Sequence, residues 1–228
     1  AEGEELPLAA VRAFSIDDAA TTEIDDAFSV TPLADGGWTV GIHIAAPGLG
    51  FGPDSDLGRI ARGRLSTVYM PGRKITMLPE SVVEGFTLAA GRAVSAVSLY
   101  LHVAADYRVL GQQTRLERVP VVANLRHHDI EPVFNAETLA EGLGEFAWRD
   151  ELTTLWELAQ VLEAGRGKPS DNATRKDYAF AVDWDAPVGA AGEAGVVGIA
   201  ERPRGSPLDV LVAELMIVAN STWGALLR

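Results

Sequence analysis

The sequence predicts an α+β fold, described equally as mixed α/β, in which helices surround a mixed β-sheet. Three observations predict it. Alternating apolar and polar residues dominate the first half, helical stripes of leucine occur in the second half, and a further strand pattern lies between those stripes. Hydrophobic residues make up 47% of the 228 residues and charged residues 22%, so the chain carries enough apolar side chains to form a core.

Most of the predicted strands lie in the first half of the chain. Residues 28–30 and 38–44 alternate with period two on either side of the turn signal Asp-Gly-Gly at 35–37, which predicts a β-hairpin. Residues 97–103 predict another strand, paired with 115–122 across a turn at 111–113. A strand pattern returns at 178–184, followed by a predicted hairpin turn near 189–195.

Three helices are predicted from their caps and apolar stripes. Asp54 and Ser55 are typical of the start of a short helix that extends to about residue 65. The leucine stripe from 152 to 162 predicts a helix that ends at Gly165, and a polar connector follows at 166–176. Ser206 is the expected N-cap of a last helix, with Pro207 in its first turn, that runs to the end of the sequence.

Composition and charge exclude several classes of site. No cysteine occurs, which removes disulfides, thiolate zinc sites and cysteine nucleophiles. The formal net charge of −13, from 19 basic and 32 acidic residues, argues weakly against nucleic-acid binding. No uninterrupted apolar stretch reaches the roughly 18 residues of a membrane helix, and the acidic start is unlike a signal peptide, so we expect a cytoplasmic protein without a membrane segment.

An acidic constellation is the most informative feature of the sequence. Asp25 and Asp26 follow Asp17 by eight and nine residues, with Glu23 between, so a loop that folds back brings four carboxylates together. Such a group repels itself unless a hard cation lies within it, and Mg²⁺ or Mn²⁺ suits oxygen ligands better than Zn²⁺. Two such ions about 4 Å apart can hydrolyse a phosphodiester. The alternative is an acidic surface loop.

Four stretches resemble motifs of one known family. Residues 15–30 (SIDDAATTEIDDAFSV) resemble the signature of the RNB catalytic domain, the RNase II and RNase R family of exoribonucleases. Residues 38–45, 63–80 and 212–220 are similar to further family segments, in the family's order. The resemblance implies that 14–228 form part of an RNB-type catalytic domain, incomplete at its C-terminal end, and that 1–13 lead into it.

The resemblance also implies an activity. Family members degrade single-stranded RNA processively from 3′ to 5′ and release nucleoside 5′-monophosphates, by a metal-dependent hydrolysis. The four acids of the family fall on Asp17, Glu23, Asp25 and Asp26. The resemblance implies that they bind Mg²⁺, or alternatively Mn²⁺, and that one of them orients the attacking water. The sequence does not separate these roles.

RNA-binding residues are expected at other positions. Tyr69 matches a family aromatic that stacks on a base, and Phe180 is a weaker candidate for the opposite wall; the alternative for both is core packing. Glu214 and Asn220 lie on the matched last helix, where they either hold the 3′ nucleotide or satisfy the core. Basic residues flank Tyr69 and are candidates for phosphate contacts, or simply solvated: Arg59, Arg62, Arg64, Arg73 and Lys74.

The chain departs from the family at several points, which include the stretch at 82–88. Glu23 stands where the family usually has Asp, and Ala46 where an Asp normally follows His-Ile-Ala. A later arginine-bearing segment and the usual OB-type RNA-binding domains do not follow in this sequence, so we expect it to be part of a longer protein. The alternatives to an exoribonuclease are a catalytically impaired RNB-like module that binds RNA or regulates, and an acidic structural domain. The four histidines are expected in core or surface roles.

Overall fold

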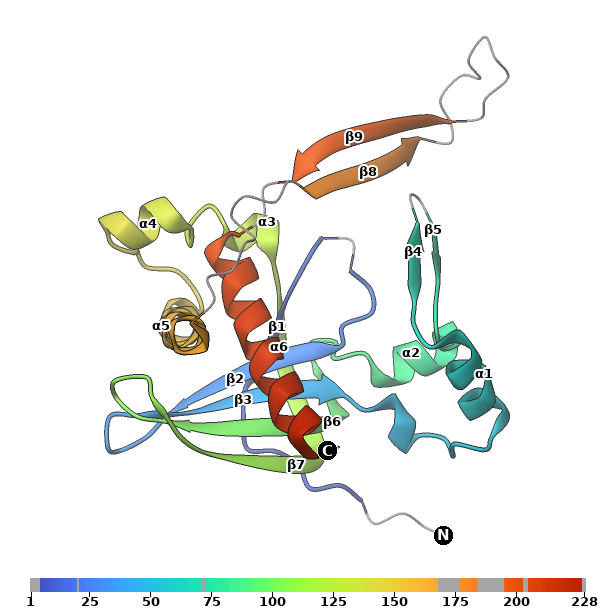
Figure 1. The fold of residues 1–228 in the computed structure, drawn as a ribbon, viewed down its shortest axis with the longest axis horizontal. Coiled ribbons are helices and arrows are strands. Elements are labelled where there is room, and N and C mark those ends of the chain that lie inside the picture. The colour runs from blue at the N-terminus through green and yellow to red at the C-terminus, as the bar shows by residue number, and fades with distance from the viewer. Residues whose placement is uncertain are drawn as a thin grey trace.

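The computed structural model describes residues 5–19, 21–70, 73–167, 177–183, 195–202 and 205–226. Five strands close into a barrel (Figure 1) in the order β1 (Ala13–Asp17), β2 (Asp26–Pro32), β3 (Trp38–Ala45), β6 (Arg92–Val103) and β7 (Val109–Arg126). Neighbouring strands are antiparallel except β1 and β7, which pair in parallel. The sheet is therefore mixed and helices surround it, as the sequence predicts.

The two hairpins of the barrel differ in how well the sequence predicts their turns. In the β2–β3 hairpin Gly36 adopts φ 84°, a left-handed conformation that a glycine accepts without strain. The predicted turn at 111–113 is wrong. Those residues lie inside β7, where Gly111 pairs with His102, and the chain turns at 104–108 with Tyr107 at φ 63°. The glycine and two glutamines at 111–113 are typical of a turn, but here they continue the pairing of β7 with β6.

The alternation predicted for the strands separates two layers of core. Small residues on one face of the strands pack inside the barrel, among them Ala13, Ala27 and Ala96. Larger residues on the other face, such as Phe28 and Leu101, pack outward against helices. Because alternate side chains of a strand point to opposite faces, one strand serves both layers.

Two long helices cover the outer face of the barrel (Figure 1). Helix α5 (Arg149–Arg166) buries Leu152, Leu155 and Leu158, as its leucine stripe predicts, and it ends at Gly167 in the left-handed conformation rather than at Gly165. Helix α6 (Pro207–Leu226) begins as predicted, since the amide of Asp209 donates to Ser206 Oγ at 3.2 Å. The short helices α3 (His127–Ile130) and α4 (Ala136–Glu141) connect β7 to α5.

Helix α6 is long and apolar enough to cross a membrane by length and composition alone. In this fold, however, Leu208, Leu211 and Leu215 are buried in the same core cluster as α5 and the outer face of the barrel. One face of α6 is therefore packed in the core, and 28% of its apolar window is buried.

The segment between β3 and β6 forms a separate group of short elements. It contains the 3₁₀ helix η1 (Pro47–Leu49), helix α1 (Asp56–Arg64), strands β4 (Val68–Met70) and β5 (Arg73–Ile75), and helix α2 (Glu80–Phe86). Ser55 caps α1 by accepting from the amide of Gly58, as predicted. Strands β4 and β5 form an antiparallel hairpin that stands clear of the barrel (Figure 1).

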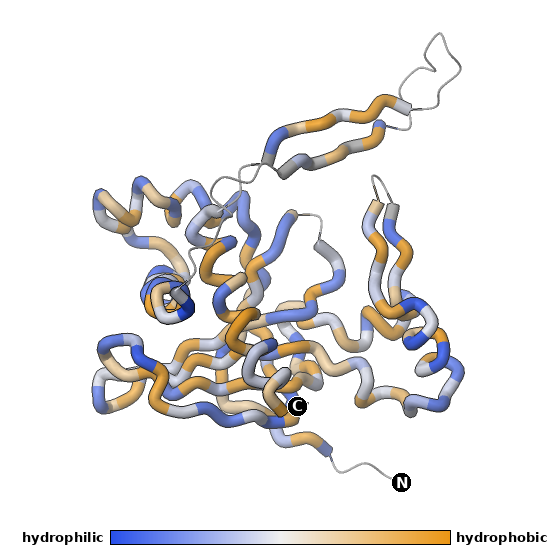
Figure 2. Tube along the Cα trace, in the orientation of Figure 1, coloured by the Kyte–Doolittle hydropathy of each residue, from blue (hydrophilic) through white to orange (hydrophobic). Residues whose placement is uncertain are grey.

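A second hairpin is formed by β8 (Asp177–Asp183) and β9 (Val196–Arg202), which confirms the predicted strand near 178–184. Trp184 and most of the turn predicted near 189–195 lie outside the described residues, as does most of the predicted connector at 166–176. Phe180 pairs with Ile199 and Val182 with Val197, so these four apolar residues share one face of the hairpin. Figure 2 shows apolar residues along both of its strands.

Candidate active site

The acidic loop lies at one end of the barrel, between the end of β1 and the start of β2. Asp17 is the last residue of β1 and Asp26 the first of β2, so the barrel itself fixes two of the carboxylates. Asp25 is held by its backbone, because its carbonyl accepts from the amide of Ala45 at 2.8 Å. The amide of Ile24 donates to Thr87 Oγ1 at 2.9 Å, which anchors the same end of the loop.

Arg126 holds the other half of the loop. It ends β7, paired in parallel with Asp17, and its Nη1 donates to the carbonyl of Asp18 at 2.8 Å and to that of Thr21 at 3.3 Å. The sequence gives no signal for this contact, because more than a hundred residues separate the two partners.

Burial and mutual repulsion raise the pKa of three aspartates here. The pKa of Asp26 rises to about 6, first through burial and then through the charges of Asp17 and Asp25. Burial also raises the pKa of Asp25, and the charges of Glu23 and Asp17 raise it further. Burial raises the pKa of Asp17 against a smaller opposing effect of a hydrogen bond from Ser15. These carboxylates therefore share one electrostatic site.

A short hydrogen-bond chain orients Asp17. Asn124 Nδ2 donates to Ser15 Oγ at 2.9 Å, and Ser15 Oγ donates to Asp17 Oδ2 at 2.5 Å. Asn124 is itself fixed, because Nδ2 also donates to the carbonyl of Leu88 and its Oδ1 accepts from the amide of Ala90. Ser15 could have been found by its position two residues before Asp17 on the same strand face, but Asn124 depends on the pairing of β1 with β7.

The chemistry of these donors fits a hard divalent cation. Buried carboxylates that raise one another's pKa are stabilised when a cation neutralises them. In their present positions, however, no three His, Asp or Glu side chains within the described ranges form a group that could hold a metal ion. A Mg²⁺ ion held here by one or two of these carboxylates would complete its ligands with waters and substrate oxygens.

Glu23 is engaged by a cation from the protein itself. Its Oε1 lies 3.2 Å from Lys74 Nζ, and the same Nζ donates to Thr22 Oγ1 at 2.9 Å. Lys74 pairs directly with Tyr69 across the β4–β5 hairpin. Burial raises the pKa of the Tyr69 phenol, and the charges of Glu23 and Asp25 add to the effect. The structure thus brings Tyr69 and Lys74 to the acidic loop.

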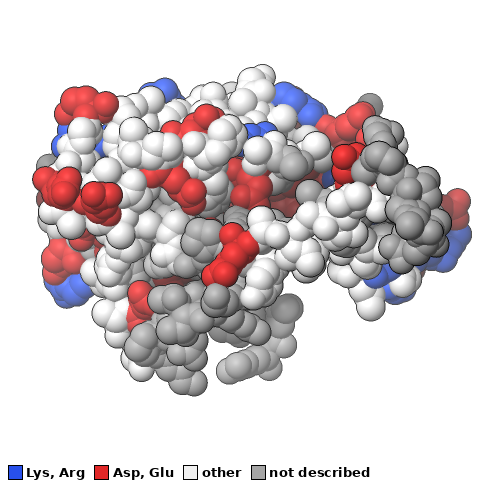
Figure 3. Space-filling model, turned by 90° about the horizontal axis from the view of Figure 1, so that it is seen from above, with Lys and Arg blue, Asp and Glu red and all other residues white. Residues whose placement is uncertain are grey.

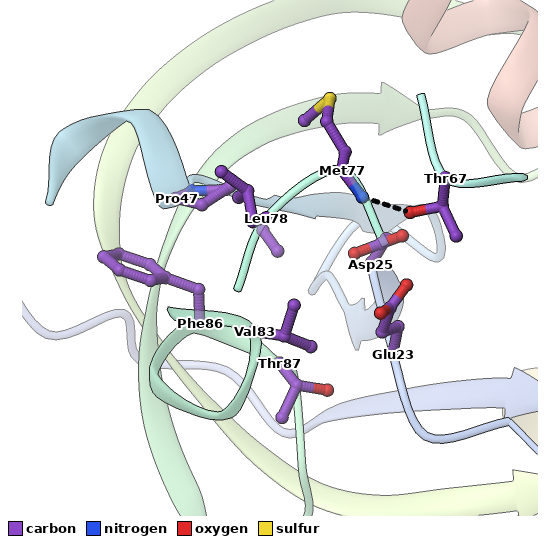
Figure 4. A pocket seen from close by; sticks show the side chains of 10 residues that line it. Glu23, Asp25, Pro47, Thr67, Met77, Leu78, Val83, Phe86 and Thr87 are labelled. Atoms are coloured by element: carbon purple, nitrogen blue, oxygen red, sulfur yellow. Dashed lines mark hydrogen bonds between the residues drawn. The ribbon is translucent and has the colours of Figure 1, made fainter. Parts of the chain in front are cut away.

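A pocket opens beside Glu23 and Asp25 (Figure 4). In the close view the two carboxylates lie next to each other on one side of it, with Thr67 nearby. The opposite side is mainly apolar, and Thr67 Oγ1 accepts from the amide of Met77 at 3.1 Å, which fixes the base of the β4–β5 hairpin. The remaining lining residues are Ala45, Pro47, Leu78, Val83, Phe86 and Thr87.

The three arginines of α1, predicted as phosphate contacts, make local interactions. Arg59 pairs with Asp56 and donates to the carbonyl of Asp54, whereas Arg62 donates to the carbonyl of Pro53. Arg64 donates to the carbonyl of Thr76. All three remain exposed, so these contacts leave donors available. The side chain of Arg73 lies outside the described residues.

The two remaining RNA-binding candidates lie in different surroundings. Phe180 is 52% exposed on the apolar face of the β8–β9 hairpin, which is not a core position. Glu214 is only 2% exposed, and both of its oxygens accept from Arg166 of α5. Glu214 thus lies in the core and is paired with Arg166, whereas Asn220 of α6 is exposed.

The histidine expectation is confirmed most clearly at His43. It is fully buried inside the barrel, where its ring nitrogens lie 2.9 Å from Ser29 Oγ and 2.8 Å from Ser98 Oγ. Burial lowers its pKa to about 3, so the ring is neutral. His43 therefore organises the interior of the barrel.

Acidic side chains outnumber basic ones in the sequence, with 32 Asp and Glu against 19 Lys and Arg. On the face drawn in Figure 3, Asp and Glu occur across the middle as well as at the edges, whereas Lys and Arg lie mainly toward the margins.

The comparison with known families agrees with the fold and the acidic motif. The model of the RNB domain matches residues 6–228, and the chain therefore belongs to the RNB domain family of exoribonucleases. Exoribonuclease 2 of Vibrio parahaemolyticus is 28% identical over the whole of this chain, which covers 33% of that relative. A protein of Arabidopsis thaliana named inactive exonuclease DIS3L2 is also 28% identical, over 91% of this chain and 20% of its own length.

Solved structures show the same fold. Mycoplasma genitalium RNase R in complex with double-stranded RNA superimposes with a TM-score of 0.77 at 16% identity, covering 97% of this chain and 38% of that one. The chain spans a third or less of the length of the curated relatives just described.

Proposed function

We propose that this chain carries the acidic half of the active site of a metal-dependent 3′-to-5′ exoribonuclease, which hydrolyses single-stranded RNA processively to nucleoside 5′-monophosphates. The observation that carries the proposal is the convergence of Asp17, Asp25 and Asp26 at one end of the barrel, where Asp17 raises the pKa of both other aspartates. Family membership and relatives named as exoribonucleases support it.

The protein's own residues would hold the reacting groups. Asp17, Asp25 and Asp26 would hold Mg²⁺ or Mn²⁺, one or two ions, whose chemistry when bound is to polarise the scissile phosphate and activate water. Ser15 fixes one oxygen of Asp17, so that its other oxygen stays free for a ligand. Water oxygen adds to phosphorus and the bond from phosphorus to the penultimate O3′ breaks, leaving a nucleoside 5′-monophosphate and a shortened RNA with a 3′-hydroxyl.

Tyr69 would bind the substrate rather than react with it. It is 71% exposed on β4, and the charges of Glu23 and Asp25 raise the pKa of its phenol. Stacking of an aromatic ring on a base contributes about 1–3 kcal/mol and tolerates any base, which suits an enzyme that must accept every nucleotide.

The direct test uses the protein with its native flanking sequence and 5′-labelled single-stranded RNA in Mg²⁺. The parent should produce a descending ladder that ends in a short product, and an Asp25→Asn variant should lose at least about a hundredfold in rate, because a ligand displaced by an ångström already costs that much. Intact RNA with the parent protein would overturn the proposal.

An RNB-like module that binds RNA without cleaving it is the second candidate. It is favoured by the ion pair between Glu23 and Lys74 and by Ala46 at a position where the family usually has Asp. This candidate predicts RNA binding that is unchanged when EDTA removes divalent cations, together with no ladder in Mg²⁺.

A further inference from the structure

The ion pair between Glu23 and Lys74 joins the acidic loop to the β4–β5 hairpin. The carboxylate of Glu23 is 10% exposed and Lys74 is 36% exposed, so the pair is shielded on the side of the acid. Lys74 Nζ has a second acceptor on the same loop in Thr22 Oγ1. One lysine thus contacts two consecutive residues of the acidic loop.

The hairpin that carries Lys74 is otherwise exposed. Val68, Tyr69 and Met70 of β4 are 48%, 71% and 40% exposed, so packing alone does little to fix where this strand lies. Tyr69 pairs directly with Lys74, and directly opposite residues of an antiparallel pair have their Cβ atoms only about 4.5–5.5 Å apart on the same face. A contact that fixes Lys74 therefore also fixes Tyr69.

We propose that Glu23 and Lys74 form a tether that holds the β4–β5 hairpin, and Tyr69 with it, beside Asp25, and that Glu23 is a positioning residue for RNA rather than a metal ligand. The inference rests on the proposed function, because that function assigns Tyr69 to RNA. It leaves Asp17, Asp25 and Asp26 as the metal ligands.

The contact distances and charges explain why Glu23 serves this role. Its longer side chain reaches Lys74 at 3.2 Å, and the lysine supplies the compensating charge that a metal ion would otherwise supply. The pair is neutral as a whole, so it adds no charge to the carboxylates of the metal site.

The test compares Glu23→Gln, Lys74→Met and the double variant in the protein with its native flanking sequence. RNA affinity is measured by fluorescence anisotropy in EDTA, where the substrate stays intact. Mn²⁺ affinity is measured separately without RNA, by the electron paramagnetic resonance of the free ion. Neither readout requires catalysis.

The tether predicts that all three variants weaken RNA binding by a similar factor, about fivefold, as part of the stacking contribution is lost. The sign of the change in RNA affinity for Glu23→Gln is decisive, because removal of a negative charge alone would strengthen RNA binding. The double variant keeps the net charge, and its Mn²⁺ affinity should stay within about twofold of the parent.

Two results would overturn the tether: RNA binding strengthened or unchanged in Glu23→Gln, or Mn²⁺ affinity lowered tenfold or more in the double variant. The matched control is Asp106→Asn with Arg108→Met, an exposed ion pair in the β6–β7 turn that makes the same charge changes. It should leave RNA affinity within about twofold. Loss of the Mg²⁺ ladder in the parent, with the tether pattern intact, would contradict the proposed function alone.

Discussion

The hydroxyl of Ser15 accepts one hydrogen bond and donates another, and this fixes the direction of its proton. Asn124 Nδ2 can only donate, so Ser15 Oγ must accept from it and direct its own proton toward Asp17. Asn124 in turn is oriented by backbone partners on both sides of its amide. Asp17 therefore sits in a preset orientation before any ligand arrives.

Ser15→Ala should lower kcat on RNA by about 10- to 100-fold, the usual cost of losing a partner that orients a metal ligand. Steady-state hydrolysis of single-stranded RNA in Mg²⁺ measures it. The control is Ser98→Ala, which removes an equally buried hydroxyl of the barrel whose partner is His43. Equal loss of kcat in both variants would show that Ser15 acts only through the packing of the barrel.

At the scale of elements, helices α5 and α6 are joined by the ion pair of Arg166 with Glu214. Glu214 lies within the apolar face of α6 and is nearly inaccessible, whereas Arg166 is 35% exposed at the end of α5. Two nitrogens of the guanidinium donate to the two carboxylate oxygens. The pair therefore aligns the end of one helix with the middle of the other.

Arg166→Met should destabilise the fold by about 2 kcal/mol, because it leaves a buried carboxylate unpaired while water still reaches part of the site. Urea unfolding measures it. Addition of Glu214→Leu should recover most of the loss, since an apolar pair of similar volume replaces the ion pair. A further loss in the double variant would contradict this account.

Local patterns predict some elements well and others poorly. The β2–β3 hairpin, α5 and the capped start of α6 follow from periodicity and caps, which are encoded within a few residues. The turn of the β6–β7 hairpin was misplaced because glycine and glutamine at 111–113 are tolerated inside a long, exposed strand end. The pairing of β1 with β7 joins residues more than a hundred apart, which no local pattern specifies.

The same distinction holds for the site. The acidic residues could be predicted because they lie within ten residues of one another in the sequence. In the structure three of them lie at or next to strand ends. The partners of those acids, Asn124, Arg126 and Lys74, come from distant strands and were either missed or given other roles. The burial of Glu214 and its pairing with Arg166 depend on the packing of α5 on α6, which lie far apart in the sequence.

For the whole molecule, the raised pKa of Asp26 links the acidic site to stability. Its carboxyl has a pKa of about 6 in the fold, against an ordinary value of 3.8. The fold thus favours the protonated form, so this contribution to stability is complete below pH 3.8 and is lost as pH rises through 6.

The metal-free protein should therefore lose on the order of 3 kcal/mol of unfolding free energy from this group between about pH 4 and pH 7. Urea unfolding in EDTA across that range measures it, and Asp26→Asn should flatten the curve. Mn²⁺ should restore stability mainly above pH 6, where the carboxylates are charged. A parent curve that rises over this range in step with that of Asp26→Asn would contradict the predicted sign.

The measurement that tests the central claim most directly is the anomalous scattering of Mn²⁺ in crystals of the protein with its native flanking sequence. The account predicts an anomalous peak among the carboxylates of Asp17, Asp25 and Asp26, with Glu23 still bound to Lys74, and loss of that peak in Asp25→Asn. Full occupancy of Mn²⁺ elsewhere, with no peak between these three aspartates, would contradict it.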